Sequence, residues 1–215
     1  MLTVIDLHIL NHVPSTRPEW WQECLASAKV AEATGLCMLH IVEATGDNIG
    51  ANRVAAFRLG QLPFVACLDN DDMLIPEGIP AMLQALAERP EVCGVYSDRS
   101  QIDATGKTLF TLRRGPWTPD FQIRQYDFPQ HLAIYRREAV MPHLDTMATF
   151  KNYSEFVLAG LATRFGPWWH IPTIAYQRRE NDYYVNHRRE IDPVTTSRAR
   201  AIVTPILLNR IKNAG

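Results

Sequence analysis

The chain has 215 residues, of which 47% are hydrophobic and 21% are charged, which is ordinary for a globular protein. Its 22 basic and 23 acidic side chains nearly cancel, so the overall charge gives no indication of a nucleic-acid or membrane partner. The N-terminus lacks the pattern of a secretory signal, and no stretch approaches the roughly 20 apolar residues that span a bilayer. Because nothing along the chain reads as a linker, we expect one domain over residues 1–215.

Short apolar runs alternate with helical stretches along the first half of the chain. Strands are expected at 3–10, 36–42, 63–68 and 92–96, and helices at 18–33, 46–60 and 76–88. Strands separated by helices of this length predict an α/β fold with a mostly parallel sheet flanked by helices. In such sheets, ligands bind at the carboxyl ends of the strands.

The four cysteines, Cys24, Cys37, Cys67 and Cys93, lie inside apolar runs. They show neither the CxxC spacing of a zinc site nor the density of a disulfide scaffold. We therefore expect reduced core thiols in a cytoplasmic protein.

The third expected strand ends in the acidic sequence Asp69-Asn70-Asp71-Asp72. Carboxylates this close raise one another's pKa, and Mg²⁺ or Mn²⁺ shared with phosphate oxygens would relieve the repulsion. The alternative is a solvated turn before the helix near Pro76, where acidic residues also favour the helix N-terminus.

The surrounding sequence resembles glycosyltransferase family two, whose members are inverting enzymes of GT-A fold. The resemblance rests on Asn48-Ile49-Gly50-Ala51-Asn52-Arg53, on the strand ending in the acidic sequence before Pro76, on Val95-Tyr96-Ser97-Asp98, and on Asp103-Ala104-Thr105-Gly106-Lys107. It covers roughly residues 36 to 110 well. It implies a donor half over about 1–110 and an acceptor half over about 111–215.

In this resemblance, the acidic residues bind the donor. Asp71 would bind the Mn²⁺ or Mg²⁺ ion that bridges the diphosphate, Asp69 would share the metal or contact the ribose, and Asp72 would orient the sugar in the catalytic site. A divalent ion on both phosphates stabilises the charge that develops as the glycosidic bond breaks.

Further donor contacts are expected from two elements. Glu43 follows the second strand, where the family places an acid that hydrogen-bonds uracil. The longer acid leaves the base identity open, and the resemblance as a whole favours a UDP-sugar. Asn48 and Arg53 belong to the helix that follows. Arg53 either approaches a phosphate or is an exposed helix arginine.

An inverting transfer also needs a general base beside the acceptor hydroxyl. The resemblance places it at the start of a helix in the second half, where Glu155 is our candidate, with Asp145 in reserve. The alternative for Glu155 is a capping box, because Asn152 stands three residues before it.

The segment after the expected strand 171–176 is rich in charge. Arg178, Arg179 and His187 are candidate phosphate or metal contacts. The alternative is a solvated basic segment, neutralised by Glu180, Asp182 and Glu190.

Two further features bear on partners. The helix expected at 195–212 packs on its own domain or, as a basic amphipathic terminus, contacts a membrane surface or a second copy of the chain. Trp168 and Trp169 either belong to the core or its edge, or stack on a sugar or a nucleobase at the acceptor side.

The sequence thus predicts a metal-dependent, inverting hexosyltransferase that moves a sugar from a nucleotide-diphosphate donor to a hydroxyl acceptor. A nucleotidyltransferase is the second reading, although no glycine follows the first strand. A catalytically silent nucleotide-sugar-binding domain is the third. A glycan, a protein, a lipid or a modified nucleic acid all remain candidate acceptors.

Overall fold

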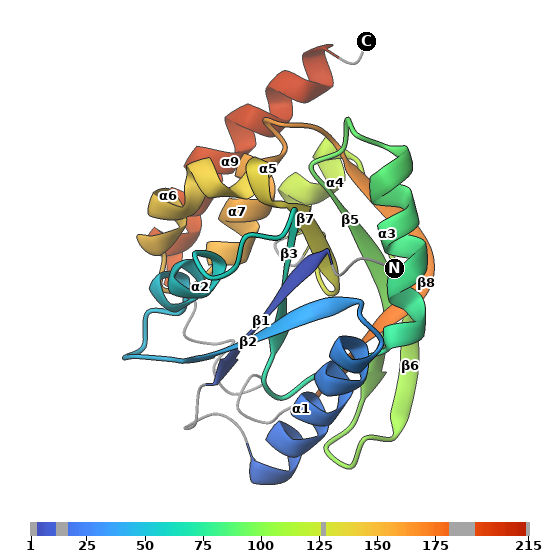
Figure 1. Cartoon of the computed structure of the whole chain (residues 1–215). Coiled ribbons are helices and arrows are strands. Elements are labelled where there is room, and N and C mark those ends of the chain that lie inside the picture. Colours follow the sequence, from blue (N-terminus) through green and yellow to red (C-terminus); the bar gives the residue numbers. More distant parts are fainter. Residues whose placement is uncertain (1–3, 12–16, 126–127, 181–191, 214–215) are drawn as a thin grey trace.

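A computed structural model describes residues 4–11, 17–125, 128–180 and 192–213. Its strands form one eight-stranded sheet in the order β2-β1-β3-β7-β5-β8-β4, with β6 paired to β5 (Figure 1). The strands are β1 (Ile5–Asn11), β2 (Cys37–Glu43), β3 (Phe64–Asp69), β4 (Met73–Leu74), β5 (Gly94–Ile102), β6 (Thr108–Leu112), β7 (Ala133–Arg136) and β8 (Trp168–Arg179).

The helices of the described residues cover the sheet. They are α1 (Pro18–Ala33), α2 (Ile49–Phe57), α3 (Ile79–Glu88), α4 (Pro119–Arg124), α5 (Arg137–Val140), α6 (Leu144–Ala148), α7 (Ser154–Ala162) and α9 (Pro193–Asn213), with short 3₁₀ turns at Pro76–Gly78 and Met141–His143. Within this part of the chain, none of the helices is both long and apolar enough to cross a membrane.

The strand directions confirm the expected α/β class. Strands β1, β2, β3, β5 and β8 run one way, and β4, β6 and β7 run the other way. The sheet is therefore mostly parallel in direction but mixed in its pairing, because β7 lies antiparallel between β3 and β5. Strands β4, β6 and β7 were not predicted from the sequence.

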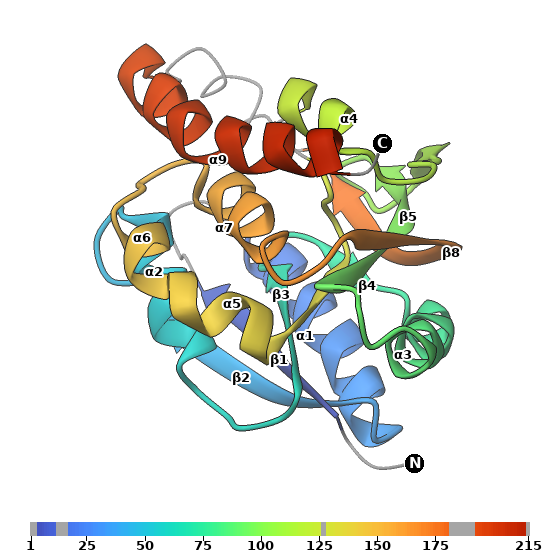
Figure 2. The ribbon, with the colours of Figure 1, turned by 90° about the horizontal axis from the view of Figure 1, so that it is seen from above.

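Each face of the sheet is covered by its own helices (Figure 2). Alternation along β3 sends Ala66 and Leu68 into one core with α1 and α3, and Val65 and Cys67 into a second core with α2, α5, α6 and α7. All four cysteines are buried and unpaired, as expected of core thiols.

Helix α9 forms an outer layer over α7 (Figure 2). Its buried residues Ala199, Val203 and Leu207 recur every four positions, so one helical stripe packs against Phe156, Val157 and Leu161. The expectation that this helix packs on its own domain is confirmed.

A buried carboxylate joins the edge of the sheet to α5. Asp6 of β1 is fully buried; its Oδ1 lies 2.7 Å from His40 Nε2, and its Oδ2 accepts hydrogen bonds from Leu62 N at 2.8 Å and from Arg137 Nη2 at 2.5 Å. Gly60 packs directly against this carboxylate in the left-handed region, with φ of 73°, and a Cβ there would collide with it.

We expect Gly60→Ala to destabilise the protein more than Gly115→Ala. Both glycines have positive φ, but a Cβ at Gly115 would meet nothing within 4 Å. The change at Gly115 should therefore cost about 1 kcal/mol of backbone strain. The change at Gly60 should cost about 3 kcal/mol or more, because it must also displace a buried, paired carboxylate. Urea unfolding of the two variants measures the free energy of unfolding of each. Equal decreases would show that the Asp6 side chain moves aside at no cost.

Candidate functional site

A polar cleft lies at the carboxyl ends of the parallel strands, where the acidic sequence ends β3. The side chains that line it include Arg53, Asp69, Asp72, His131, Glu155 and Arg178. They come from α2, β3, the segment before β7, α7 and β8, so segments far apart in the sequence meet here. This is the location at which ligands bind in open α/β sheets.

The acidic turn is held by the end of β8. Asp72 Oδ2 accepts a hydrogen bond from Tyr176 Oη at 2.7 Å, and its Oδ1 accepts one from the Arg179 backbone N–H at 2.7 Å. Burial and the charges of Asp71 and Asp69 raise the pKa of Asp72 well above its usual value. The turn therefore brings carboxyl groups close together, and burial and their mutual repulsion favour the protonated form of Asp72.

Arg179 supports this turn through its guanidinium group, which is fully buried. It donates to Asp71 O at 2.9 Å and to Asp103 O and Ala104 O at 3.3 Å, and it pairs with Glu23. Although Arg179 lines the cleft, these contacts engage its guanidinium with the protein itself. The structure thus gives this predicted donor-binding residue a supporting position.

Arg53 connects the acidic turn to α7. Its Nη2 lies 2.9 Å from Asp69 Oδ1 and 2.8 Å from Glu155 Oε1. Burial would raise the pKa of Asp69, but the positive charges around it, with Arg53 foremost, and the hydrogen bond from Arg53 together outweigh burial and lower this pKa. Burial raises the pKa of Glu155 to about 7, in spite of the opposing charge of Arg53. One arginine thus faces an ionised carboxylate and a carboxyl group that titrates near neutrality.

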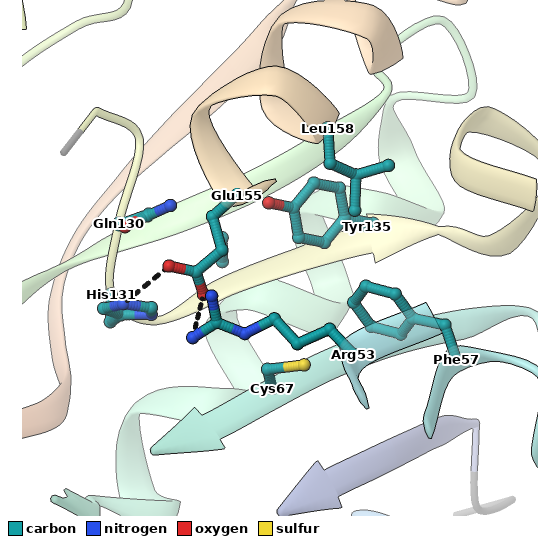
Figure 3. Close-up of a pocket in the computed structure, with 9 residues that line it drawn as sticks. Arg53, Phe57, Cys67, Gln130, His131, Tyr135, Glu155 and Leu158 are labelled. Atoms are coloured by element: carbon teal, nitrogen blue, oxygen red, sulfur yellow. Dashed lines mark ion pairs between the residues drawn. The ribbon is translucent and has the colours of Figure 1, made fainter. Parts of the chain in front are cut away.

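The capping box is not formed. Helix α7 begins at Ser154, its N-cap residue is Tyr153 with φ of 61°, and no side chain caps it. Glu155 instead directs its carboxylate at Arg53 (Figure 3). The reserve candidate Asp145 is 93% exposed and pairs with Arg58 at 2.8 Å, outside the residues that line the cleft.

His131 is a site residue that was not predicted from the sequence. Its Nε2 lies 3.6 Å from Asp69 Oδ2 and 3.8 Å from Glu155 Oε2, and its ring stacks on Tyr176 with centroids 5.2 Å apart. Burial lowers the pKa of His131 to about 3, so the imidazole is neutral at physiological pH. In the sequence, the polar pair Gln130-His131 stands directly before an apolar run. This pattern indicates a cleft residue only once β7 is known to run antiparallel to β3, because the start of β7 then lies beside the carboxyl end of β3.

A small cavity lies behind Glu155 (Figure 3). It has a volume of about 10 Å³ and is lined by Arg53, Cys67, Tyr135 and Leu158 among others. This volume is about that of one water molecule in a buried polar site. Figure 3 shows the Tyr135 ring alongside the helix that carries Glu155.

The remaining predicted donor-binding residues lie in different settings. Glu43 ends β2 and accepts hydrogen bonds from Asn11 Nδ2 at 3.0 Å. Asn48 caps α2 by accepting from Ala51 N and donates to Ala148 O at 3.1 Å, so it fixes α2 against the end of α6. Arg178 lines the cleft, and its charge helps to lower the pKa of Asp69. His187 lies outside the described residues.

The donor set suits a hard cation only in part. Among the described residues, no group of three or more His, Cys, Asp or Glu side chains could hold a metal ion. Asp69 offers carboxylate oxygens to the cleft, whereas Asp71 is buried and is not among the residues that line it. Mg²⁺ commonly takes one or two carboxylates and completes its shell with phosphate and water. These residues therefore fit a cation that arrives with a diphosphate rather than a preformed metal cage.

The paired tryptophans lie away from the cleft. Trp168 is buried and donates to Ala159 O at 3.1 Å, whereas Trp169 is exposed under the Arg89 guanidinium, 3.5 Å from the ring centroid. Both begin β8, and the cleft is at its other end, about 30 Å away for a strand of this length. The expectation that they belong to the core or its edge is confirmed, and the alternative, stacking on a sugar in this cleft, is not met.

Comparisons with known proteins agree with this geometry. No protein family model matches the chain. The O-antigen biosynthesis protein RfbC of Myxococcus xanthus is 30% identical over 77 residues, which are 36% of this chain and 6% of RfbC.

Crystal structures of S. aureus TarS share the architecture. TarS 1–349 in complex with UDP-GlcNAc superposes with a TM-score of 0.60 at 12% identity, over 83% of this chain and 59% of that one. The structure of TarS 1–349 in complex with UDP superposes with a TM-score of 0.57 at 13% identity, over 87% of this chain and 64% of that one. The chain thus spans less than two thirds of the proteins that it resembles. At this identity the likeness establishes the fold, and the chain is a GT-A-fold protein.

Proposed function

We propose that the chain is a glycosyltransferase that transfers a sugar from a UDP-linked donor to a hydroxyl acceptor. The observation that carries this proposal is the meeting of Glu155, a half-buried carboxyl group with a pKa of about 7, with Asp69 at the end of β3. The donor class is supported by TarS, a protein of the same fold that was crystallised with UDP-GlcNAc and with UDP.

Asp69 and Asp71 are the residues that would hold a divalent ion, Mn²⁺ or Mg²⁺. Such an ion, when bound, offsets the charge that develops on the leaving diphosphate. Asp72, fixed by Tyr176 and by the Arg179 backbone, keeps the turn in place and orients the sugar from the wall of the cleft.

Glu155 acts as the general base. With a pKa near neutrality it is partly ionised at physiological pH, which suits a group that must both take and later release a proton. It removes the proton from the acceptor hydroxyl as the oxygen attacks the anomeric carbon. A direct displacement of this kind inverts the configuration of the sugar.

We expect Asp71→Ala to abolish the Mn²⁺-dependent part of UDP binding, because this carboxylate anchors the ion. Calorimetric titration with UDP in Mn²⁺ and in EDTA separates the Mn²⁺-dependent part of the UDP affinity from the Mn²⁺-independent part. The matched control is Asp145→Ala, which removes an exposed carboxylate. If Asp71→Ala binds UDP in Mn²⁺ as tightly as the parent protein, the metal assignment is wrong.

Glu155→Gln should lower turnover by about 10²- to 10⁴-fold, because the amide cannot accept the proton. UDP affinity and melting temperature should stay near the parent values, since Gln keeps the shape and a hydrogen bond to Arg53. Release of UDP from UDP-GlcNAc, with melting measured on the same preparation, makes the test. Near-parental turnover would remove Glu155 from the role of base.

The pH dependence of turnover should follow Glu155. The base works only when ionised, so kcat/KM should rise with pH through about 7 and then level off. A profile measured from about pH 5 to about pH 9 reports the pKa of the free enzyme. A flat profile below pH 7 would contradict the assignment.

A further inference from the structure

One amino group of Arg53 contacts two of the carboxyl groups that line the cleft, those of Asp69 and Glu155. The same Nη2 atom of Arg53 lies 2.9 Å from Asp69 Oδ1 and 2.8 Å from Glu155 Oε1. Asp69 comes from the donor-side strand and Glu155 from the helix that supplies the base. Two acids from separate elements are therefore neutralised by a shared cation inside the fold.

Arg53 is held in this position by the packing of its helix. Gly50, one turn earlier in α2, lies so close to the backbone carbonyls of Phe150 and Met147 that a Cβ would collide with them. The Asn48 side chain ties the start of α2 to Ala148 O. The Arg53 side chain is itself only 10% exposed, so the guanidinium cannot simply turn into solvent.

This position sets Arg53 in competition with a metal ion. A divalent cation on Asp69 would bind a carboxylate whose Oδ1 the guanidinium already engages, and the two positive groups would repel each other at close range. A nucleotide diphosphate brings the negative charge that offsets this repulsion. The cost of adding the cation therefore falls when both ligands arrive together.

We propose that Arg53 serves as a built-in substitute for the divalent ion at Asp69, so that the cation binds together with the diphosphate and only weakly alone. The inference rests on the proposed function, because it takes Asp69 as a metal ligand. In the complex, Arg53 keeps its contact with Glu155 and positions this base. Arg53 is thus a positioning residue that also makes metal and donor binding cooperative.

Titrations with MnCl₂ alone, with UDP in EDTA and with UDP in Mn²⁺ test this on the intact chain. Arg53→Gln should bind Mn²⁺ alone on the order of tenfold more tightly than the parent, because a neutral amide replaces the competing charge. The factor by which Mn²⁺ and UDP raise each other's affinity should shrink in the same variant. Arg53→Lys, which keeps the charge, should behave like the parent protein.

The matched control is Arg58→Gln, since Arg58 follows α2 and pairs with Asp145 at the surface. It should leave every Mn²⁺ and UDP affinity unchanged. Circular dichroism and melting establish that each variant is folded. If Arg58→Gln and Arg53→Gln change the Mn²⁺ affinity equally, the change in net charge explains the effect, and the inference is overturned.

Two results separate the inference from the proposed function. Cooperative Mn²⁺ and UDP binding in the parent, without tighter Mn²⁺ binding in Arg53→Gln, overturns the inference alone. UDP binding that ignores Mn²⁺ in the parent overturns the metal-dependent function and the inference with it. One measurement needs only the parent protein. If the parent binds Mn²⁺ alone as tightly as it binds Mn²⁺ in the presence of UDP, Arg53 does not weaken Mn²⁺ binding and the inference is overturned.

Discussion

The site depends on one electrostatic constraint, the need of two acids in a desolvated cleft for a shared positive charge. Asp69 ends a central strand and Glu155 begins a helix, and Arg53 lies between them. An uncompensated carboxylate in this position would be protonated or expelled into water. The close packing of α2, through Gly50 and Asn48, fixes the helix that carries that arginine.

Local patterns were enough to predict most of the sheet and its helices. The helix expected at 18–33 is α1 with the same bounds, because Pro18 marks its start and Gly35 follows shortly after its end. Strand β7 was missed, since its four residues pair with β3 and β5, both far away in sequence. Pairing with β3 and β5, rather than a pattern in its own residues, identifies β7 as a strand. The position of His131 in the cleft could not be predicted without this strand, because His131 lies two residues before it.

The roles of individual site residues were harder to predict than the fold. Asn152 and Glu155 have the spacing of a capping box, and only the left-handed Tyr153 and the contact with Arg53 show that this cap is not made. Arg179 looks in sequence like an exposed phosphate contact. Its burial is decided by carbonyl groups of Asp71, Asp103 and Ala104, which no local pattern brings together.

The attachment of the acidic turn to β8 bears on the thermodynamics of ligand capture. Tyr176 and the Arg179 backbone hold Asp72 from a strand that pairs with β5 along its whole length. The conformational entropy of this turn is therefore already lost when the protein folds. A ligand that binds there meets a preorganised surface, and little of its interaction energy is consumed in ordering the chain.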